Sequence, residues 1–190
     1  CITSISQVLT GNSERFQAFL DLCATFENRA LMTWAGISST AMEEGQTPPI
    51  DRYIVFSGKE GKALDNNVNF LNGYNYTVYA PDNAAMQIAH EQMGLPTYDQ
   101  INEVYNVATS EDATAEEEAA GKAKARKMID AVRAFVRYHF QNNSVFADNH
   151  VKETSYQSLY SSDLGIPVNI TSKSSGGVLI VTDAANQRIV

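Results

Sequence analysis

The stretch that decides the fold is NYTVYAPDNAAM, residues 75–86. Its β-branched and aromatic side chains predict a strand over residues 77–80. Pro81 ends that strand, because proline has no N–H to donate to a neighbouring strand. Asp82 or Asn83 then caps a helix by accepting hydrogen bonds from its first free N–H groups. The stretch therefore predicts a strand that runs through a proline corner straight into a helix.

The helix after this corner has one predicted buried face. Met86, Ala89, His90 and Met93 recur at i, i+3, i+4 and i+7, which places them on one side of a helix. Gly94 suits the C′ position that ends many helices, and Pro96 prevents the helix from continuing. We therefore expect the helix to stop at about residue 93.

An earlier helix is predicted near the start of the chain. Ser13 is its expected N-cap, followed by an acidic first turn. An apolar stripe at helical spacing then predicts the buried face: Phe16, Phe19, Leu20 and Cys23. Val8 and Leu9 fall in a shorter preceding turn. Residues 29–50 show no clear periodicity and end in the loop-like GQTPPI, so no helix is predicted there.

The clearest helix lies in SEDATAEEEAAGKAKARKMIDAVRAFVRYHF, residues 110–140. Its acidic start suits the positive end of the helix dipole, and AEEEAA is a solvated first turn rather than a cation site. Glu118 and Lys122 form a favourable i, i+4 pair. One apolar stripe predicts the packing face: Ala125, Met128, Ile129, Val132, Phe135, Val136 and His139.

Strands are predicted mainly late in the chain. DRYIVFSG at 51–58 is an early candidate, and short alternating runs follow the long helix at 144–147, 150–160, 166–172 and 177–183. SKSSGG at 172–177 is the predicted turn of a hairpin. Because helices come first and strands later, without regular alternation, the pattern favours an α+β fold over a doubly wound sheet.

Composition limits the functions that this chain can have. It has 190 residues, 44% hydrophobic and 19% charged, which are values for one globular domain. Its formal net charge is −8, and an acidic surface repels phosphate backbones, so we expect no nucleic-acid partner. No apolar run reaches the length of a membrane-spanning helix. The two cysteines, Cys1 and Cys23, fit either one disulfide or two free thiols.

The sequence offers no set of residues with the spacing of an active site. His90, His139 and His150 lack a partner at metal-ligand spacing, so no metal and no cofactor are predicted. His90 and His139 lie on apolar helix faces and are interpreted as hydrogen-bonded core residues. GKEGKA at 58–63 lacks the spacing and the Ser/Thr of a phosphate loop. No catalytic residue is assigned.

Three segments together resemble the fasciclin domain. YTVYAPDNAAM is similar to the first signature of that family, in which a strand leads through A-P-x-N into a helix. VRAFVRYHF is similar to the second, a helix ending in Tyr138-His139, and SISQVLTGNSERFQAFLDL is similar to the first helix of the family. The resemblance implies a β-wedge of twisted antiparallel or mixed sheets flanked by several helices, here with insertions. It also gives Pro81, Asp82, Asn83, Tyr138 and His139 as candidate binding residues that more plausibly buttress the fold.

The chain departs from the family pattern in two places. The segments at residues 33–73 and between the two signatures are longer than usual. GGVLIVTDAANQRIV follows Tyr138-His139 too soon to be the closing strand and is interpreted as the preceding hairpin. Residues 1–190 are therefore expected to form a single fasciclin-like domain that either lacks its final strand or ends divergently.

The resemblance implies a non-catalytic, extracytoplasmic adhesion module that contacts protein or glycan at a cell surface. The domain is then expected at the cell surface or on an outer-membrane lipoprotein, with the membrane contacted only through a lipid anchor. Cys1 fits either a lipid-bearing first residue or a fragment boundary, and the second interpretation is favoured. Two alternatives stay open: a secreted enzyme or small-ligand receptor with a polar pocket near a histidine, and an assembly subunit that exchanges strands. The oligomeric state is not predicted.

Overall fold

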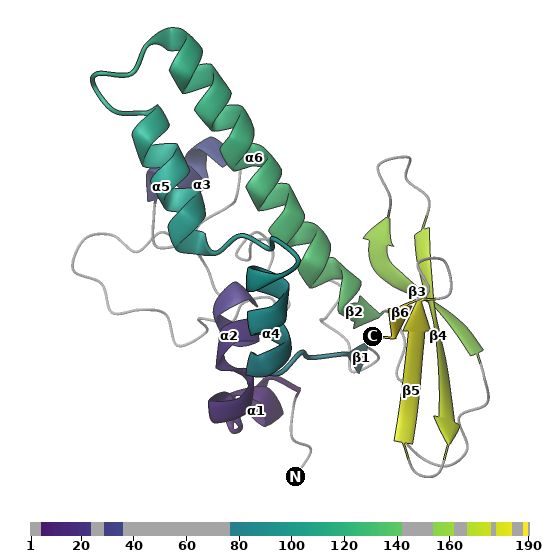
Figure 1. The fold of residues 1–190 in the computed structure, drawn as a ribbon. Coiled ribbons are helices and arrows are strands. Elements are labelled where there is room, and N and C mark those ends of the chain that lie inside the picture. Colours follow the sequence, from purple (N-terminus) through teal and green to yellow (C-terminus); the bar gives the residue numbers. More distant parts are fainter. Residues whose placement is uncertain are drawn as a thin grey trace.

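The chain has an α+β fold, with the helices before residue 139 and the longer antiparallel strands after it (Figure 1). From a computed structural model we describe residues 5–23, 29–35, 77–141, 154–161, 167–175, 178–183 and 188–189. The helices are α1 (Ile5–Thr10), α2 (Ser13–Cys23), α3 (Arg29–Ala35), α4 (Asn83–Glu91), α5 (Tyr98–Ala108) and α6 (Ala115–Tyr138). The predicted α+β class is therefore confirmed. The predicted strands at 51–58 and 144–147 lie outside the described residues.

The strands form one antiparallel sheet in which each strand pairs with the next along the chain. They are β1 (Thr77–Val78), β2 (Phe140–Gln141), β3 (Thr154–Ser161), β4 (Pro167–Ser175), β5 (Val178–Asp183) and β6 (Arg188–Ile189). Ser175 pairs with Val178, so the hairpin turn predicted at 172–177 is shorter than expected and the ladder itself extends through Ser175. β5 and β6 form a further antiparallel pair.

The first two helices meet in a tight turn at Gly11 and Asn12. The Asn12 carbonyl accepts from the N–H groups of Arg15 and Phe16, at 3.0 and 3.2 Å, so Asn12 stands where Ser13 was expected to cap the helix. Ser13 is instead the first residue of α2. The predicted stripe is confirmed, since Phe19, Leu20 and Cys23 are buried and Phe16 packs against the core.

The proline corner holds a shorter strand and a shorter helix than the sequence predicts. β1 ends at Val78, although the Tyr79 N–H still donates to the His139 carbonyl at 2.9 Å. α4 ends at Glu91, and Gly94 follows with a φ of +74°, in the left-handed region that glycine tolerates. Met93 lies past the helix end and is 62% exposed, so its prediction as a buried residue was wrong.

Two helices were not predicted. α3 lies in the segment without clear periodicity, and α5 lies in the long segment between the two signatures. α5 begins with a reciprocal capping box, in which Thr97 accepts from the Gln100 N–H and the Gln100 side chain accepts from the Thr97 N–H. α6 begins with the same kind of capping box, formed by Thr114 and Glu117. The pattern T-x-x-Q is a sequence signal that could have identified α5.

The core lies where the helices meet each other and the short strands. Its fully buried large side chains include Phe19, Leu20, Leu31, Met86, Ile101, Ile129, Val132, Phe140 and Gln141. The predicted stripe of α6 is confirmed: Ala125, Ile129, Val132, Val136 and His139 are buried, and Met128 and Phe135 pack against the core. Cys23 is a buried free thiol, and burial raises the pKa of its thiol far above the ordinary value.

α3 is joined to α6 by a cation at its C-terminal end, and to α5 by an aromatic contact. The Arg126 guanidinium of α6 donates to the carbonyls of Ala35 at 2.8 Å and Trp34 at 3.3 Å. It also lies 4.5 Å from the centre of the Trp34 ring, which in turn packs against Tyr105 of α5. A cation at the negative end of a helix dipole is favourable, so this contact joins α3, α5 and α6.

Candidate functional site

Asn83 ties the start of α4 to the middle of α2. Its Oδ1 accepts from the Ala18 N–H at 3.0 Å, and its Nδ2 donates to the Glu14 carbonyl at 2.9 Å. These two backbone groups are four residues apart, the spacing at which an α-helix pairs an N–H with a carbonyl. Both ends of the amide are therefore engaged with one turn of a neighbouring helix. Only Asn or Gln carries a donor and an acceptor in such a planar pair, which explains the residue type.

We predict that Asn83→Ala lowers the free energy of unfolding by roughly 1–3 kcal/mol, because it removes two hydrogen bonds that join α4 to α2, each worth about 0.5–1.5 kcal/mol. Asn83→Asp is expected to lose a similar amount, since a carboxylate can still accept from the Ala18 N–H but places a negative charge against the Glu14 carbonyl in place of a donor. Urea unfolding followed by circular dichroism measures both. Asn12→Ala, at an exposed asparagine whose side chain donates to the Val8 carbonyl four residues earlier, is the control and is expected to lose less. Equal losses at positions 83 and 12 would contradict this role for Asn83.

Asp82 is the N-cap of α4, one of the two alternatives that the sequence left open. Its Oδ1 accepts from the Ala85 N–H at 3.0 Å, and its other carboxylate oxygen lies 3.8 Å from the Arg15 guanidinium. The carboxylate lies at the positive end of the α4 dipole, which favours a negative charge. Pro81 precedes it and is half-buried. Asp82 thus contacts α2 through an ion pair, and Asn83 contacts the same helix through two side-chain hydrogen bonds.

His139 caps the C-terminal end of α6 at the point where the chain enters β2. Its ring Nδ1 lies 2.7 Å from the Phe135 carbonyl, and its backbone carbonyl accepts from the Tyr79 N–H. The ring packs at 4.4 Å from the Phe135 ring and edge-on against Tyr138 at 5.7 Å. The main chain of His139 therefore links the helix to the sheet, while its side chain bonds within its own helix.

Phe19 connects the two signature segments. Its ring, which is fully buried, lies 5.9 Å from the His139 ring and 6.5 Å from the Phe140 ring. It lies on α2, one residue after the Ala18 that Asn83 binds. The corner, the first helix and the end of α6 therefore converge in one junction, which we call the signature junction: Phe19, Tyr79, Asp82, Asn83, Tyr138, His139 and Phe140.

A polar pair closes the junction on the strand side. The Tyr79 hydroxyl donates to the Gln141 Oε1 at 2.9 Å, and Gln141 is fully buried in β2. Burying an amide is costly unless it is hydrogen-bonded. The Tyr79 hydroxyl therefore supplies a hydrogen bond that the buried Gln141 amide needs. Neither residue was predicted as important from the sequence, because their partnership depends on the pairing of β1 with β2.

The buried His139 predicts a pH dependence of stability. Burial lowers the pKa of His139, against the opposing effect of its bond to Phe135. A histidine whose pKa is lower in the folded state contributes stability above its unfolded pKa of about 6.5, and this contribution is lost as pH falls. We expect the free energy of unfolding to decline from pH 7.5 toward pH 5 more steeply in the wild type than in His139→Gln. Urea titrations at each pH test this, and parallel curves would contradict it.

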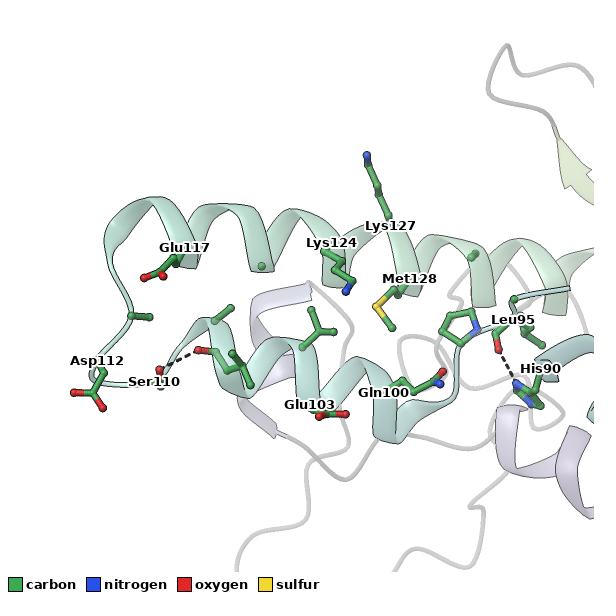
Figure 2. A pocket seen from close by; sticks show the side chains of 18 residues that line it. His90, Leu95, Gln100, Glu103, Ser110, Asp112, Glu117, Lys124, Lys127 and Met128 are labelled. Carbon is green, nitrogen blue, oxygen red and sulfur yellow. Dashed lines mark hydrogen bonds between the residues drawn. The ribbon is translucent and has the colours of Figure 1, made fainter. Parts of the chain in front are cut away.

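A separate groove runs between α5 and α6 and extends to the end of α4 (Figure 2). Its volume is about 1000 Å³. Apolar side chains form much of its lining, and polar ones stand along it: Leu95, Pro96, Val104, Val107, Ala108, Met128 and Ala131, with His90, Gln100, Glu103, Ser110, Asp112, Glu117, Lys124 and Lys127. None of the five candidate site residues lines this groove, so those residues did not identify it.

His90 lies at one end of the groove, where α4 and the loop after it form the lining. Its Nδ1 lies 2.8 Å from the Leu95 carbonyl, and it is half-buried. With Nδ1 protonated toward that carbonyl, Nε2 is left to accept a hydrogen bond. His90 is thus hydrogen-bonded, as expected, and it also borders a cavity, as the receptor alternative expected of a histidine. His139 does not line this groove, and His150 lies outside the described residues.

The described part of the chain holds no cluster of three or more histidine, cysteine or acidic side chains that could bind a metal ion. Among the same residues, no helix combines the length and the apolar character needed to cross a bilayer.

Glu117, an acidic residue of the groove, has a lowered pKa because Thr114 donates to its carboxylate. Its carboxylate therefore belongs to the cap of α6.

Comparisons with known proteins returned no match: no protein-family model, no curated protein and no solved structure matches the chain.

Proposed function

We propose that this chain is a non-catalytic binding module of the fasciclin type, which contacts protein or glycan at a cell surface from an extracytoplasmic location. The observation that carries the proposal is the signature junction. Residues 13–23, 77–86 and 135–140, which carried the resemblance, are far apart in sequence but contact one another through Asn83, Phe19 and His139.

The chemistry of the junction supports a structural role for three of the five candidate residues. The Asn83 amide is bound at both ends, Asp82 caps α4, and the His139 ring is only 8% exposed. Side chains engaged in this way fix the angle between strand and helix and would have to break these bonds to reach a ligand. In this proposal they buttress a wedge-shaped domain, and the surfaces around them bind the partner.

A small-ligand receptor is the second candidate, and the groove favours it. Its volume of about 1000 Å³ is at the upper end for small-molecule sites, and His90 offers a polar group at one end. In that case His90→Ala should abolish binding of the small ligand. In the adhesion proposal the same substitution should leave binding to a surface partner unchanged.

Direct binding tests the adhesion proposal. The purified chain, immobilised on beads, is presented with a glycan array and with collagen, fibronectin and laminin. We expect saturable binding to at least one of these, lost when the chain is unfolded by heat. A thermal-shift screen with small metabolites runs in parallel. Stabilisation by a small ligand that depends on His90, together with no binding on either panel, would overturn the adhesion proposal in favour of the receptor.

A further inference from the structure

Two opposite charges lie level with each other in the groove between α5 and α6. Gly121 of α6 meets α5 at Val104 and Ala108. The two helices run antiparallel, so one turn forward along α6 corresponds to one turn back along α5 (Figure 1). Lys124 of α6 therefore lies level with Glu103 of α5, and both residues line the groove. The Lys124 side chain extends toward α5 (Figure 2).

Within the described part of the chain, neither the Glu103 carboxylate nor the Lys124 ammonium takes part in an ion pair or a side-chain hydrogen bond. The other charged residues of the groove are placed differently. The Glu117 carboxylate is held in the cap of α6, Asp112 lies near the turn that joins the two helices, and Lys127 points away from α5 (Figure 2). Glu103 and Lys124 are therefore an acid and a base at one level of the groove, each able to bind a ligand of opposite charge.

We propose that the middle of this groove binds a small zwitterion with an apolar side chain, which is the chemistry of an apolar α-amino acid. The ligand carboxylate binds the Lys124 ammonium, and the ligand ammonium binds the Glu103 carboxylate, so each charge of the protein gains one opposite partner. A ligand with a single charge would leave one of the two residues unmatched. The site goes beyond the adhesion role proposed above and does not depend on it.

Apolar side chains beside the two charges provide a surface for the side chain of the ligand. Met128 follows Lys124 by four residues and Val107 follows Glu103 by four, so each lies on the same side of its helix as the charge. Both line the groove, where Val107 is 67% exposed although it is a large hydrophobic residue. A ligand that covers these side chains removes apolar area from water, which favours binding.

Isothermal titration calorimetry of the full chain tests the proposal with L-leucine and two analogues that each lack one charge. N-acetyl-L-leucine has no ammonium group, and L-leucinamide has no carboxylate. We expect saturable binding of L-leucine and at least about tenfold weaker binding of each analogue, because each analogue leaves one charge of the groove without its partner. No binding of L-leucine, or equal binding of all three compounds, would overturn the proposal.

Substitution of each charged residue should remove the discrimination against one analogue only. In Glu103→Gln the affinity ratio of L-leucine to N-acetyl-L-leucine should fall toward one, while L-leucinamide stays the weaker ligand. In Lys124→Met the two analogues exchange these roles. Lys127→Met is the matched control, because Lys127 points away from α5, and it should leave both ratios unchanged (Figure 2). Ratios that are unchanged in Glu103→Gln and Lys124→Met would overturn the proposal.

His90→Ala separates this site from the small-ligand receptor considered above. His90 lies at one end of the groove, next to Leu95, whereas Glu103 and Lys124 lie farther along α5 and α6 (Figure 2). The substitution should therefore leave the binding of L-leucine unchanged. A loss as large as that in Lys124→Met would place the ligand at the histidine end of the groove and overturn the proposed site.

Discussion

Phe19→Ala is expected to lower the free energy of unfolding by about 3–5 kcal/mol, the range for truncating a buried phenylalanine. Phe19 is fully buried and packs against the rings of both His139 and Phe140. Its removal opens a cavity at the point where α2, α6 and β2 meet. Because a domain of this kind is stable by only about 5–15 kcal/mol, the loss would be a large part of the total. Urea unfolding at constant pH measures it.

Phe16→Ala is the matched control for this experiment. Phe16 lies on the same helix, one turn earlier, but is only half-buried and has the Arg15 guanidinium 5.2 Å from its ring centre. The same substitution there removes the same atoms from a partly wet site and should cost clearly less. Comparable losses at positions 16 and 19 would show that the signature junction is not a centre of stability.

The local parts of this fold could be predicted because they follow local rules. The proline corner, the cap at Asp82 and the buried stripe of α6 depend on residues within a few positions of one another. α5 has the same kind of signal, a capping box at Thr97 and Gln100 with Ile101, Tyr105 and Ala108 buried at helical spacing. It was not predicted, because the family resemblance assigns this segment to an insertion between the two signatures.

The long-range parts could not be predicted, since they depend on how elements are placed in space. Asn83 binds backbone groups 65 and 69 residues earlier in the chain, and no pattern around residue 83 identifies them. Met93 was placed in the core by extending a helical stripe past the residue where the helix ends. The groove requires α5 and α6 to lie side by side, so a prediction that lacked α5 could not include it.

Gly121→Ala is expected to destabilise the protein by roughly 1–3 kcal/mol, although alanine is the better helix former by about 1 kcal/mol. A Cβ at this position would lie 2.4 Å from the Ala108 Cβ and 3.4 Å from its Cα. Ala108 is itself buried, and neither methyl group can rotate out of the way. Relief requires α5 and α6 to move apart, which disturbs the packing along both helices.

A double-mutant cycle separates this close approach from helix propensity. Ala108→Gly alone should lose about 1 kcal/mol, because glycine is a poor helix former. In Ala108→Gly/Gly121→Ala the clashing methyl group is gone, so the double variant should be more stable than the sum of the single losses predicts. Urea unfolding of all four proteins gives the coupling energy. If the two losses simply add, or if Gly121→Ala stabilises the protein, then α5 and α6 do not meet at this point as closely as described.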